Sequence, residues 1–339
     1  MSSRDPYDGT GIEFYDISSF TFSNGLTKPI KIAYRPFNSS STKGAVLIPT
    51  CFGGLINSTL NFTTGALKDY YVIVVAMLGN GESSSPSNDT DFPLSKSGPS
   101  VQYEDNINAQ YKLVTEHLGV KELEAVIGFS MGGQQAYYWA VMHGSFSKRI
   151  VAICSSAKTS GHNYAFLEGP IAALETSSDY EGGAYRAKGI KPRLGLRAFG
   201  RAYTAWLTSA EWYRQELWRS MGAESLQSYL YPEVAGHEHR DAEDLFCLAR
   251  CWQAGDIGKV GGNGDYKKAL AGITSRVLLM PSRTDQYFPP RDSEIEMESL
   301  RYGVLAPIET IWGHIAGGGA NPVDLKYMDS TIAGFLQGE

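Results

Sequence analysis

The chain has 339 residues, of which 30 are basic and 36 acidic, giving a formal net charge of −6. That balance argues against a nucleic-acid-binding protein, which would show a surplus of Lys and Arg gathered on one face. The sequence has no apolar run of about 18 residues, so it predicts no membrane-spanning helix. Its 37 glycines and 12% aromatic residues are typical of a globular enzyme rather than of a coiled coil or a disordered tail.

The start of the chain and its cysteine content bear on the compartment. The first residues, MSSRDPYDGTGIEFYD, contain no apolar segment of the kind that directs secretion. Four cysteines in a chain of this length do not make a disulfide framework. We therefore expect a cytoplasmic protein that acts on a small molecule, with no nucleic-acid or membrane partner.

Short apolar runs in the first 155 residues predict strands of a parallel sheet that are buried on both faces. Helical patterns lie between them at Val101–Leu118, which Ser100 would cap, and at Met131–His143. This alternation predicts a doubly wound α/β sheet. The predicted strands are Ile30–Tyr34, Ala45–Pro49, Tyr71–Ala76, Leu123–Ile127 and Ile150–Ser155.

Residues 156–268 carry a different pattern. Two aromatic-rich stretches, WLTSAEWYRQELWRSMG and DAEDLFCLARCWQ, predict helices there, and no strand pattern stands out. The α/β pattern then returns with strands at Arg276–Met280 and Ala306–Trp312 and a closing helix at Asp324–Leu336. We therefore predict a core formed by residues 1–155 and 269–339, with residues 156–268 inserted as a helical cap.

The strongest chemical signal is a G-x-S-x-G motif that runs from Gly128 to Gly132, with Ser130 at its centre. It lies between a predicted strand and a predicted helix, which is the context that a nucleophile elbow requires. The sharp turn would lift the Ser130 hydroxyl above the edge of the sheet and place it at a helix N-terminus, where backbone N–H groups favour negative charge. A chance match in a loop is the alternative interpretation.

A serine hydroxyl is a weak nucleophile that needs a base, and the base needs an acid to orient it. Asp285 lies in PSRTDQYFPP, directly after the predicted strand Arg276–Met280, and His314 lies in the segment after the next predicted strand, Ala306–Trp312. Both residues are therefore expected at the same edge of the sheet as Ser130. The chain order Ser, Asp, His is the order of the α/β-hydrolases. Taken singly, Asp285 could be a turn former and His314 a packed loop histidine.

The other candidates for base or metal ligand fit less well. Cys247 and Cys251 lie four residues apart on a predicted helix without two further ligands at zinc spacing. We therefore predict no metal site and no cofactor. His117 and His143 end predicted helices, and His162 precedes the acid in the chain. His237 and His239 form only a weak His-x-His pattern.

Acyl-enzyme chemistry also needs two N–H groups that bind the oxyanion. Met131, which follows the nucleophile, would supply one of them. The loop PTCFGGLINST would supply the other, from Phe52 in the first place or from Cys51. The alternative interpretation of this loop is a simple turn.

Several motifs resemble the homoserine O-acetyltransferase-like branch of the α/β-hydrolase superfamily: GFSMGGQQAYYWA, SSAKTSGHNYAFLEGPIAAL, AMLGNGESSSPSN, SRTDQYFPP and GHIAGGG. The likeness is closest to fungal members, many of them linked to secondary metabolism, and it runs along nearly the whole chain. It implies an α/β-hydrolase fold with a helical cap, and a homodimer. By position it implies that Ser130 is the nucleophile, Asp285 the acid and His314 the base, with Phe52 and Met131 as the oxyanion residues.

The sequence departs from the acetyltransferases where those enzymes bind their substrate. They hold the homoserine carboxylate with an Arg in a cap helix, a few residues ahead of a Tyr, and these positions fall on Phe199 and Trp206. Arg197 and Arg201 would be turned about 200° away on the helix. The oxyanion loop also reads PTCFGG instead of the usual His-Ala-Leu-Thr-Gly-like run. These differences predict a bulkier, more apolar acyl or alcohol group, bound by Cys51 and the aromatic side chains of the cap.

We therefore expect a serine enzyme that forms an acyl-enzyme from a small-molecule ester, thioester or related carbonyl and then hydrolyses it. The second hypothesis is an O-acyltransferase that uses acyl-CoA as co-substrate. A lyase or cyclase, or a binding protein on the same scaffold, are further alternatives. Hydrolysis and transfer use the same residues, so the sequence leaves open whether water or an alcohol receives the acyl group.

Overall fold

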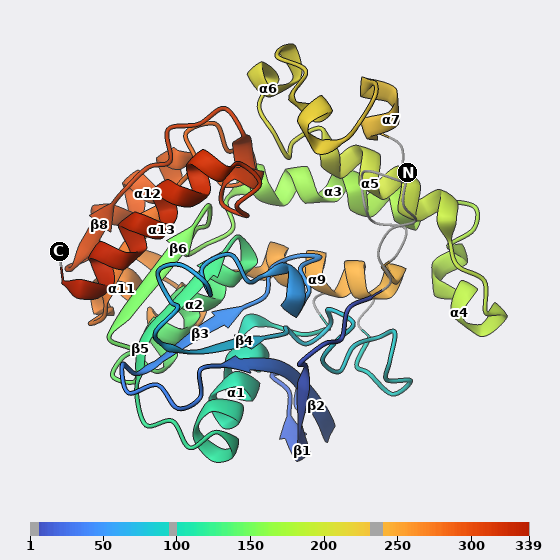
Figure 1. The fold of residues 1–339 in the computed structure, drawn as a ribbon. Helices are drawn as coiled ribbons and strands as arrows, with labels where there is room; N and C mark the ends of the chain where they lie inside the picture. The colour runs from blue at the N-terminus through green and yellow to red at the C-terminus, as the bar shows by residue number, and fades with distance from the viewer. Residues whose placement is uncertain (1–6, 95–99, 231–239, 339) are drawn as a thin grey trace.

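The computed structural model describes residues 7–94, 100–230 and 240–338. Within these residues the chain forms an eight-stranded sheet in the order β1-β2-β4-β3-β5-β6-β7-β8 (Figure 1). Strand β2 pairs antiparallel with β1 and with β4, and the other neighbours are parallel. The strands are β1 (Glu13–Thr21), β2 (Thr27–Phe37), β3 (Ala45–Pro49), β4 (Tyr71–Val75), β5 (Leu123–Phe129), β6 (Arg149–Ile153), β7 (Arg276–Met280) and β8 (Gly303–Leu305).

Helices lie against the sheet and in a long stretch of chain between β6 and β7 (Figure 1). Those outside that stretch are α1 (Tyr103–Lys112), α2 (Met131–Met142), α12 (Pro290–Met297) and α13 (Pro322–Gln337). Those within it are α3 (Gly161–Glu175), α4 (Tyr185–Lys188), α5 (Arg193–Thr204), α6 (Ala210–Arg214), α7 (Leu226–Leu230), α9 (Ala242–Ala254), α10 (Gly258–Gly261) and α11 (Tyr266–Gly272). A π-helical turn at Leu113–His117 continues α1.

The central strands are apolar along their whole length because helices cover both faces of the sheet. In β3, Ala45 and Leu47 belong to one core cluster, and Val46 and Ile48 belong to the other. Helices α1 and α2 contribute to the first cluster and α13 to the second. Parallel strands that are buried on both sides show no polar alternation. This arrangement confirms the predicted doubly wound α/β sheet.

The predicted strand at Ala306–Trp312 is wrong. Strand β8 instead comprises Gly303–Leu305, and the chain leaves the sheet soon after it. Pro307 has no N–H group to donate to the sheet, so regular pairing stops there. Beyond it, Ile308 forms an isolated bridge with Ser282.

Strand β1 was not predicted, and α1 begins two residues later than predicted. Strand β1 is an edge strand in which Ile17 and Phe20 are buried between exposed residues, so it shows neither a buried run nor a clean alternation. Helix α1 follows Gln102 rather than Ser100, because the Asp105 carboxylate accepts a hydrogen bond from the Gln102 N–H group (2.9 Å). Neither feature shows in the hydrophobic pattern alone.

We call residues 156–268 the cap segment, after the boundaries predicted from the sequence. Its helices α3 and α5 lie side by side above the sheet, and α3 also packs against α9 (Figure 1). Helices α10 and α11 pack instead against α2. The described part of the segment, residues 156–230 and 240–268, contains no strand. None of the helices that the structure describes is both long enough and apolar enough to cross a membrane.

Glu296 on α12 is a buried carboxylate that joins three parts of the fold. Its Oε2 accepts a hydrogen bond from the Tyr137 hydroxyl on α2 (2.5 Å), and its Oε1 accepts one from the Ala157 N–H group after β6 (2.6 Å). Burial raises the pKa of Glu296 to about 8, because the charged form loses its hydration.

This raised pKa makes the stability of the fold depend on pH. Between the ordinary glutamate pKa and about 8, the folded protein holds a proton that the unfolded chain has lost. The free energy of unfolding should therefore fall as pH rises, by up to about 1.4 kcal/mol per pH unit. Glu296→Gln keeps an acceptor for the Ala157 N–H group and can donate its amide hydrogen to the Tyr137 hydroxyl oxygen, but it has no proton to lose. We expect it to flatten this decline and to exceed the wild type in stability at the upper end.

Urea unfolding of both proteins at several pH values between about 5 and 8 measures the difference. Other carboxyl groups titrate equally in the two proteins, so the change in slope belongs to Glu296. Curves that run parallel across this range would contradict the prediction.

Candidate active site

Ser130 lies in the sharp turn between β5 and α2. Its backbone has a φ of 56° and a ψ of −126°, which is rare for a residue with a side chain. The turn is held by the Ser130 N–H group, which donates to the Ile153 carbonyl (2.9 Å), and by the Ser155 hydroxyl, which donates to the Ser130 carbonyl (2.8 Å). A Cβ atom on Gly128 would lie 2.0 Å from the backbone of Gly132. The turn can therefore be this tight only with a glycine at position 128.

The structure brings Ser130, His314 and Asp285 together in one chain of hydrogen bonds. His314 Nε2 lies 2.9 Å from Ser130 Oγ, and His314 Nδ1 lies 2.7 Å from Asp285 Oδ2. The three residues are 2%, 3% and 4% exposed. Because a carboxylate can only accept, His314 Nδ1 carries the hydrogen that it donates to Asp285. That leaves Nε2 free to accept the proton of the Ser130 hydroxyl.

Aromatic rings and backbone N–H groups hold the acid and the base in place. Asp285 Oδ1 accepts hydrogen bonds from the N–H groups of Tyr287 (2.8 Å) and Phe288 (3.0 Å). The His314 ring packs against Phe129, Tyr287 and Phe288, with ring centroids 4.7, 4.8 and 5.6 Å away. Tyr287 and Phe288 are not among the predicted site residues, although they follow the acid by two and three positions in TDQYF.

The alternative histidines make contacts away from Ser130. His117 hydrogen-bonds to the Tyr34 hydroxyl (2.9 Å), and His143 stacks on the Tyr111 ring at 4.0 Å. His162 lies on the exposed side of α3. These positions leave His314 as the histidine that the structure places beside the serine.

The described part of the chain contains no cluster of metal-binding side chains. No group of three or more His, Cys, Asp or Glu side chains there could hold a metal ion. Cys247 and Cys251 are buried free thiols on α9. His237 and His239 lie outside the described residues.

The two predicted oxyanion residues lie on neighbouring loops. Strands β3 and β5 are adjacent and parallel, so the loop after β3, which carries Phe52, meets the turn after β5 at the same edge of the sheet. The Gln135 side chain on α2 donates to the Thr50 carbonyl (2.9 Å) and ties this loop to the helix. Met131 is the first residue of α2, and N–H groups in the first turn of a helix have no acceptor inside it.

The Phe52 side chain belongs to an aromatic cluster that extends from the cap segment to His314. Its ring lies 5.3 Å from Tyr203, 6.1 Å from Phe199 and 5.7 Å from Trp252. Phe199 is 0% exposed, so it packs against other rings and does not line an open space. This packing does not support the expectation of a bulky group bound at Phe199. The buried members of the cluster are Phe52, Phe166, Phe199, Tyr203, Trp252, Tyr287 and Phe288.

Trp206 and Cys51, the other predicted substrate contacts, lie in different settings. Trp206 is 38% exposed, and its ring packs against Phe166 and His162 at the outer edge of the cluster. Cys51 directly precedes Phe52, and burial raises the pKa of its thiol to about 11. The thiol is therefore protonated at neutral pH and is a poor nucleophile beside Ser130.

The end of α5 and the residues after it are joined to the loops that carry the acid and the base. The Leu207 carbonyl accepts a hydrogen bond from the His314 N–H group (3.0 Å). The Thr208 carbonyl accepts one from Gln286 Nε2 (2.6 Å), next to Asp285. The position of the base therefore depends on the cap segment as well as on the sheet.

Comparison with known proteins points to one large group of enzymes. The family model described as alpha/beta hydrolase fold matches residues 44–193. The chain is 30% identical over 337 residues to an ethyl acetate hydrolase of Pseudomonas veronii, covering 96% of this chain and 95% of that protein.

A solved structure and a transferase show the same likeness. The crystal structure of an acetylester hydrolase from Corynebacterium glutamicum matches with a TM-score of 0.88 and 29% identity, covering 96% of each chain. A homoserine O-succinyltransferase of Ralstonia pickettii is 30% identical over 246 residues, which is 68% of this chain and 60% of that enzyme. Esterases and homoserine acyltransferases are thus both among the relatives.

The contact between cap segment and base loop can be tested at Gly313. This residue has a φ of 61°, and a Cβ atom there would lie 2.6 Å from Thr208 Cα. Gly313→Ala is expected to push the turn that carries His314 away from the cap segment. Since a shift of about 1 Å weakens a catalytic contact strongly, Ser130 should react with a fluorophosphonate reagent about tenfold more slowly, or slower still.

The reaction rate is measured by fluorescence of the labelled protein on a denaturing gel. Gly318→Ala is the matched control, because the nearest atom to a Cβ there is 3.4 Å away and the variant should react like the wild type. Wild-type reactivity in Gly313→Ala would show that His314 does not depend on this contact.

Proposed function

Because the chain belongs to the α/β-hydrolase superfamily, in the branch that includes acetyl ester hydrolases and homoserine O-acyltransferases, we propose that it hydrolyses short-chain carboxylic esters, above all acetyl esters. The observation that carries the proposal is the chain of hydrogen bonds from Ser130 through His314 to Asp285. The ethyl acetate hydrolase that matches 96% of the chain supports the choice of acetyl esters.

In the proposed reaction, Ser130 Oγ attacks the ester carbonyl while His314 Nε2 takes its proton. Asp285 holds the His314 ring and stabilises the positive charge that forms on it. The N–H groups of Met131 and Phe52 bind the oxyanion of the tetrahedral intermediate. His314 then gives the proton to the departing alcohol, and a water molecule releases the acyl group from Ser130 by the same steps.

The packing around the serine supports a small acyl group. Ser130 is almost fully buried, and the aromatic cluster fills the region between His314 and the cap segment. Further methylene groups on the acyl chain would have to displace these rings, which are packed against one another. An acetyl group would displace these rings the least.

Homoserine acyl transfer is the second candidate, and the cap segment argues against it. The position where the acetyltransferases carry an Arg is Phe199, a buried ring in the aromatic cluster. Arg197 and Arg201 have exposed side chains on the other side of α5. A carboxylate that enters next to Phe199 would lose its water to a buried aromatic ring instead of the Arg side chain that the acetyltransferases offer there.

We extend the proposal to the cap segment, the assembly, the cofactor requirement and the compartment of the enzyme. The cap segment would act as a lid, and the chain would work as a homodimer without a metal or organic cofactor, in the cytoplasm. The free thiols support a reducing compartment, and the family resemblance supports the lid and the dimer. A role in secondary metabolism stays a prediction from the likeness to fungal members.

The hydrolase proposal is tested on a series of 4-nitrophenyl esters. The wild type should release the acetyl group fastest, and kcat/KM should fall by about tenfold or more at the octanoyl ester, because the longer chain must displace aromatic rings. Ser130→Ala should lose at least about 10³-fold of the acetyl activity, because members of such a triad act as a unit. Initial rates at 400 nm measure both effects.

Circular dichroism confirms that the Ser130→Ala variant is folded. Acetyl ester turnover that survives the substitution would refute the role of Ser130. A preference for the octanoyl ester would leave the nucleophile in place but refute the short-chain assignment.

Transfer is tested beside hydrolysis on the same protein. With acetyl-CoA and L-homoserine, we expect at most trace O-acetylhomoserine, at a kcat/KM at least about 100-fold below that of acetyl ester hydrolysis, because the buried Phe199 ring stands where the acetyltransferases carry Arg. Mass spectrometry of the product measures the transfer. Efficient formation of O-acetylhomoserine would show instead that Arg197 or Arg201 binds the carboxylate.

A further inference from the structure

The loop after β3 is held in place by residues other than Ser130, Asp285 and His314. Arg240, two residues before α9, donates a hydrogen bond to the Gly53 carbonyl. Asn80 Nδ2, from the loop after β4, donates to the Gly54 carbonyl (3.3 Å). Both carbonyls lie within two residues of Phe52, so the contacts hold the part of the loop that carries the second oxyanion donor.

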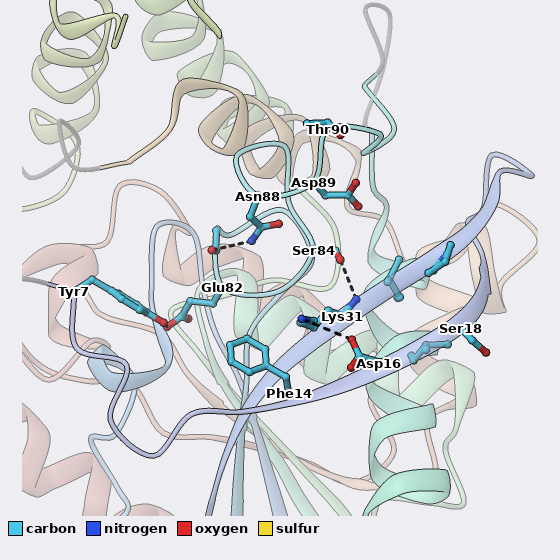
Figure 2. A pocket seen from close by; sticks show the side chains of 14 residues that line it. Tyr7, Phe14, Asp16, Ser18, Lys31, Glu82, Ser84, Asn88, Asp89 and Thr90 are labelled. Atoms are coloured by element: carbon cyan, nitrogen blue, oxygen red, sulfur yellow. Dashed lines mark hydrogen bonds and ion pairs between the residues drawn. The ribbon is translucent and has the colours of Figure 1, made fainter. Parts of the chain in front are cut away.

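Glu82 holds the next part of the same loop. Its Oε2 accepts a hydrogen bond from the Ile56 N–H group (2.8 Å), and its Oε1 accepts one from the Tyr7 hydroxyl (3.1 Å). Figure 2 shows the Tyr7 and Glu82 side chains pointing toward one another in a cleft of about 700 Å³. Glu82 is 7% exposed, so these partners replace most of the water around its carboxylate.

Glu82 and Arg240 also interact electrostatically. Burial raises the pKa of Glu82, and the nearby Arg240 charge acts against this rise. Burial lowers the pKa of Arg240, and the Glu82 charge acts against that in turn. An acidic side chain from the core and a basic side chain from the cap segment therefore hold one short loop, and each favours the charged form of the other.

The loop needs such external support because of its own composition. It contains two consecutive glycines, Gly53 and Gly54, which leave the backbone with more freedom than any other residue pair would. An oxyanion donor contributes to catalysis only when it is in place before the charge develops. Freedom at these glycines would spread the Phe52 N–H group over several orientations.

We propose that Glu82 and Arg240 are positioning residues that hold the Phe52 N–H group toward the oxyanion formed at Ser130. The inference rests on the proposed function, because it assigns the oxyanion loop of that reaction. Glu82 fixes the loop through Ile56, and Arg240 fixes it through Gly53. In this proposal both side chains act through the backbone of the loop and not on the reacting atoms.

The test is the rate at which Ser130 is phosphonylated by a fluorophosphonate, a reaction that also develops charge on an oxygen held by the oxyanion donors. Glu82→Ala and Arg240→Met are expected to lower the first-order rate constant by about 10- to 100-fold. The concentration for half-maximal rate should change by less than about threefold. Glu82→Gln should stay within about threefold of the wild type, because its amide can still accept from Ile56 and donate to Tyr7.

Asp105→Ala is the matched control for loss of a buried carboxylate. Asp105 is also buried and accepts hydrogen bonds from the N–H groups of Ser23 (2.6 Å) and Gln102 (2.9 Å), outside the oxyanion loop. It should lose thermal stability and keep the wild-type phosphonylation rate. An equal loss of rate in Asp105→Ala would overturn the proposal, as would wild-type rates in Glu82→Ala and Arg240→Met.

Acetate release by the wild type reports separately on the proposed function. A wild type that is phosphonylated but releases no acetate from acetyl esters would refute the hydrolase assignment. The rates of the Glu82 and Arg240 variants would still decide whether these residues position the loop, because phosphonylation does not depend on the natural substrate.

Discussion

A single hydrogen bond, 2.9 Å between Ser130 Oγ and His314 Nε2, joins residues 184 positions apart and sets the requirements for the rest of the structure. Ser130 must stand above the sheet, which the tight turn after β5 achieves at the expense of a strained backbone. His314 must reach it from the far end of the chain. Parallel strands β5, β6 and β7 end at one edge, so the segments that follow them meet there without long connections.

Burial strengthens this hydrogen bond, and it also means that the buried polar groups need partners in place of water. A carboxylate that is removed from water needs hydrogen-bond donors in place of its hydration, and the N–H groups of Tyr287 and Phe288 supply them to Asp285. The rings of the same two residues pack against His314. One short stretch after β7 thus satisfies the acid and orients the base, which leaves little freedom for either side chain.

The cap segment contributes hydrogen bonds to the loops around Ser130 and His314. Leu207 accepts a hydrogen bond from the backbone of His314, and Arg240 reaches the loop after β3. Hydrolases and acyltransferases of this superfamily share the chemistry of the serine, so the difference between them lies in what binds the second substrate. Here Phe199 of the cap segment is a buried ring that packs against Phe52 and Tyr203, which supports the proposal that this chain differs from the transferases in the cap segment.

Local sequence patterns were enough to predict the parts of the protein that depend on neighbouring residues. Apolar runs such as AVLIP predicted the buried strands, and the motif around Ser130 predicted the turn, because strand, turn and helix are each written within a few residues. The order of Asp285 and His314 after two late strands, one of which proved shorter and earlier than predicted, then placed both candidates at the edge of the sheet where the structure has them.

Features that rest on contacts between distant segments became visible in the folded chain alone. Strand β1 is stabilised by its pairing with β2 and has a weak pattern of its own, and β8 ends where Pro307 interrupts the sheet. The burial of Phe199, the contact of Thr208 with Gln286, and the contact of Arg240 with Gly53, 187 residues apart, leave no periodic trace in the sequence. Such contacts form because the fold brings the side chains together, and hydrophobic pattern and motif spacing carry no information on which distant residues will meet.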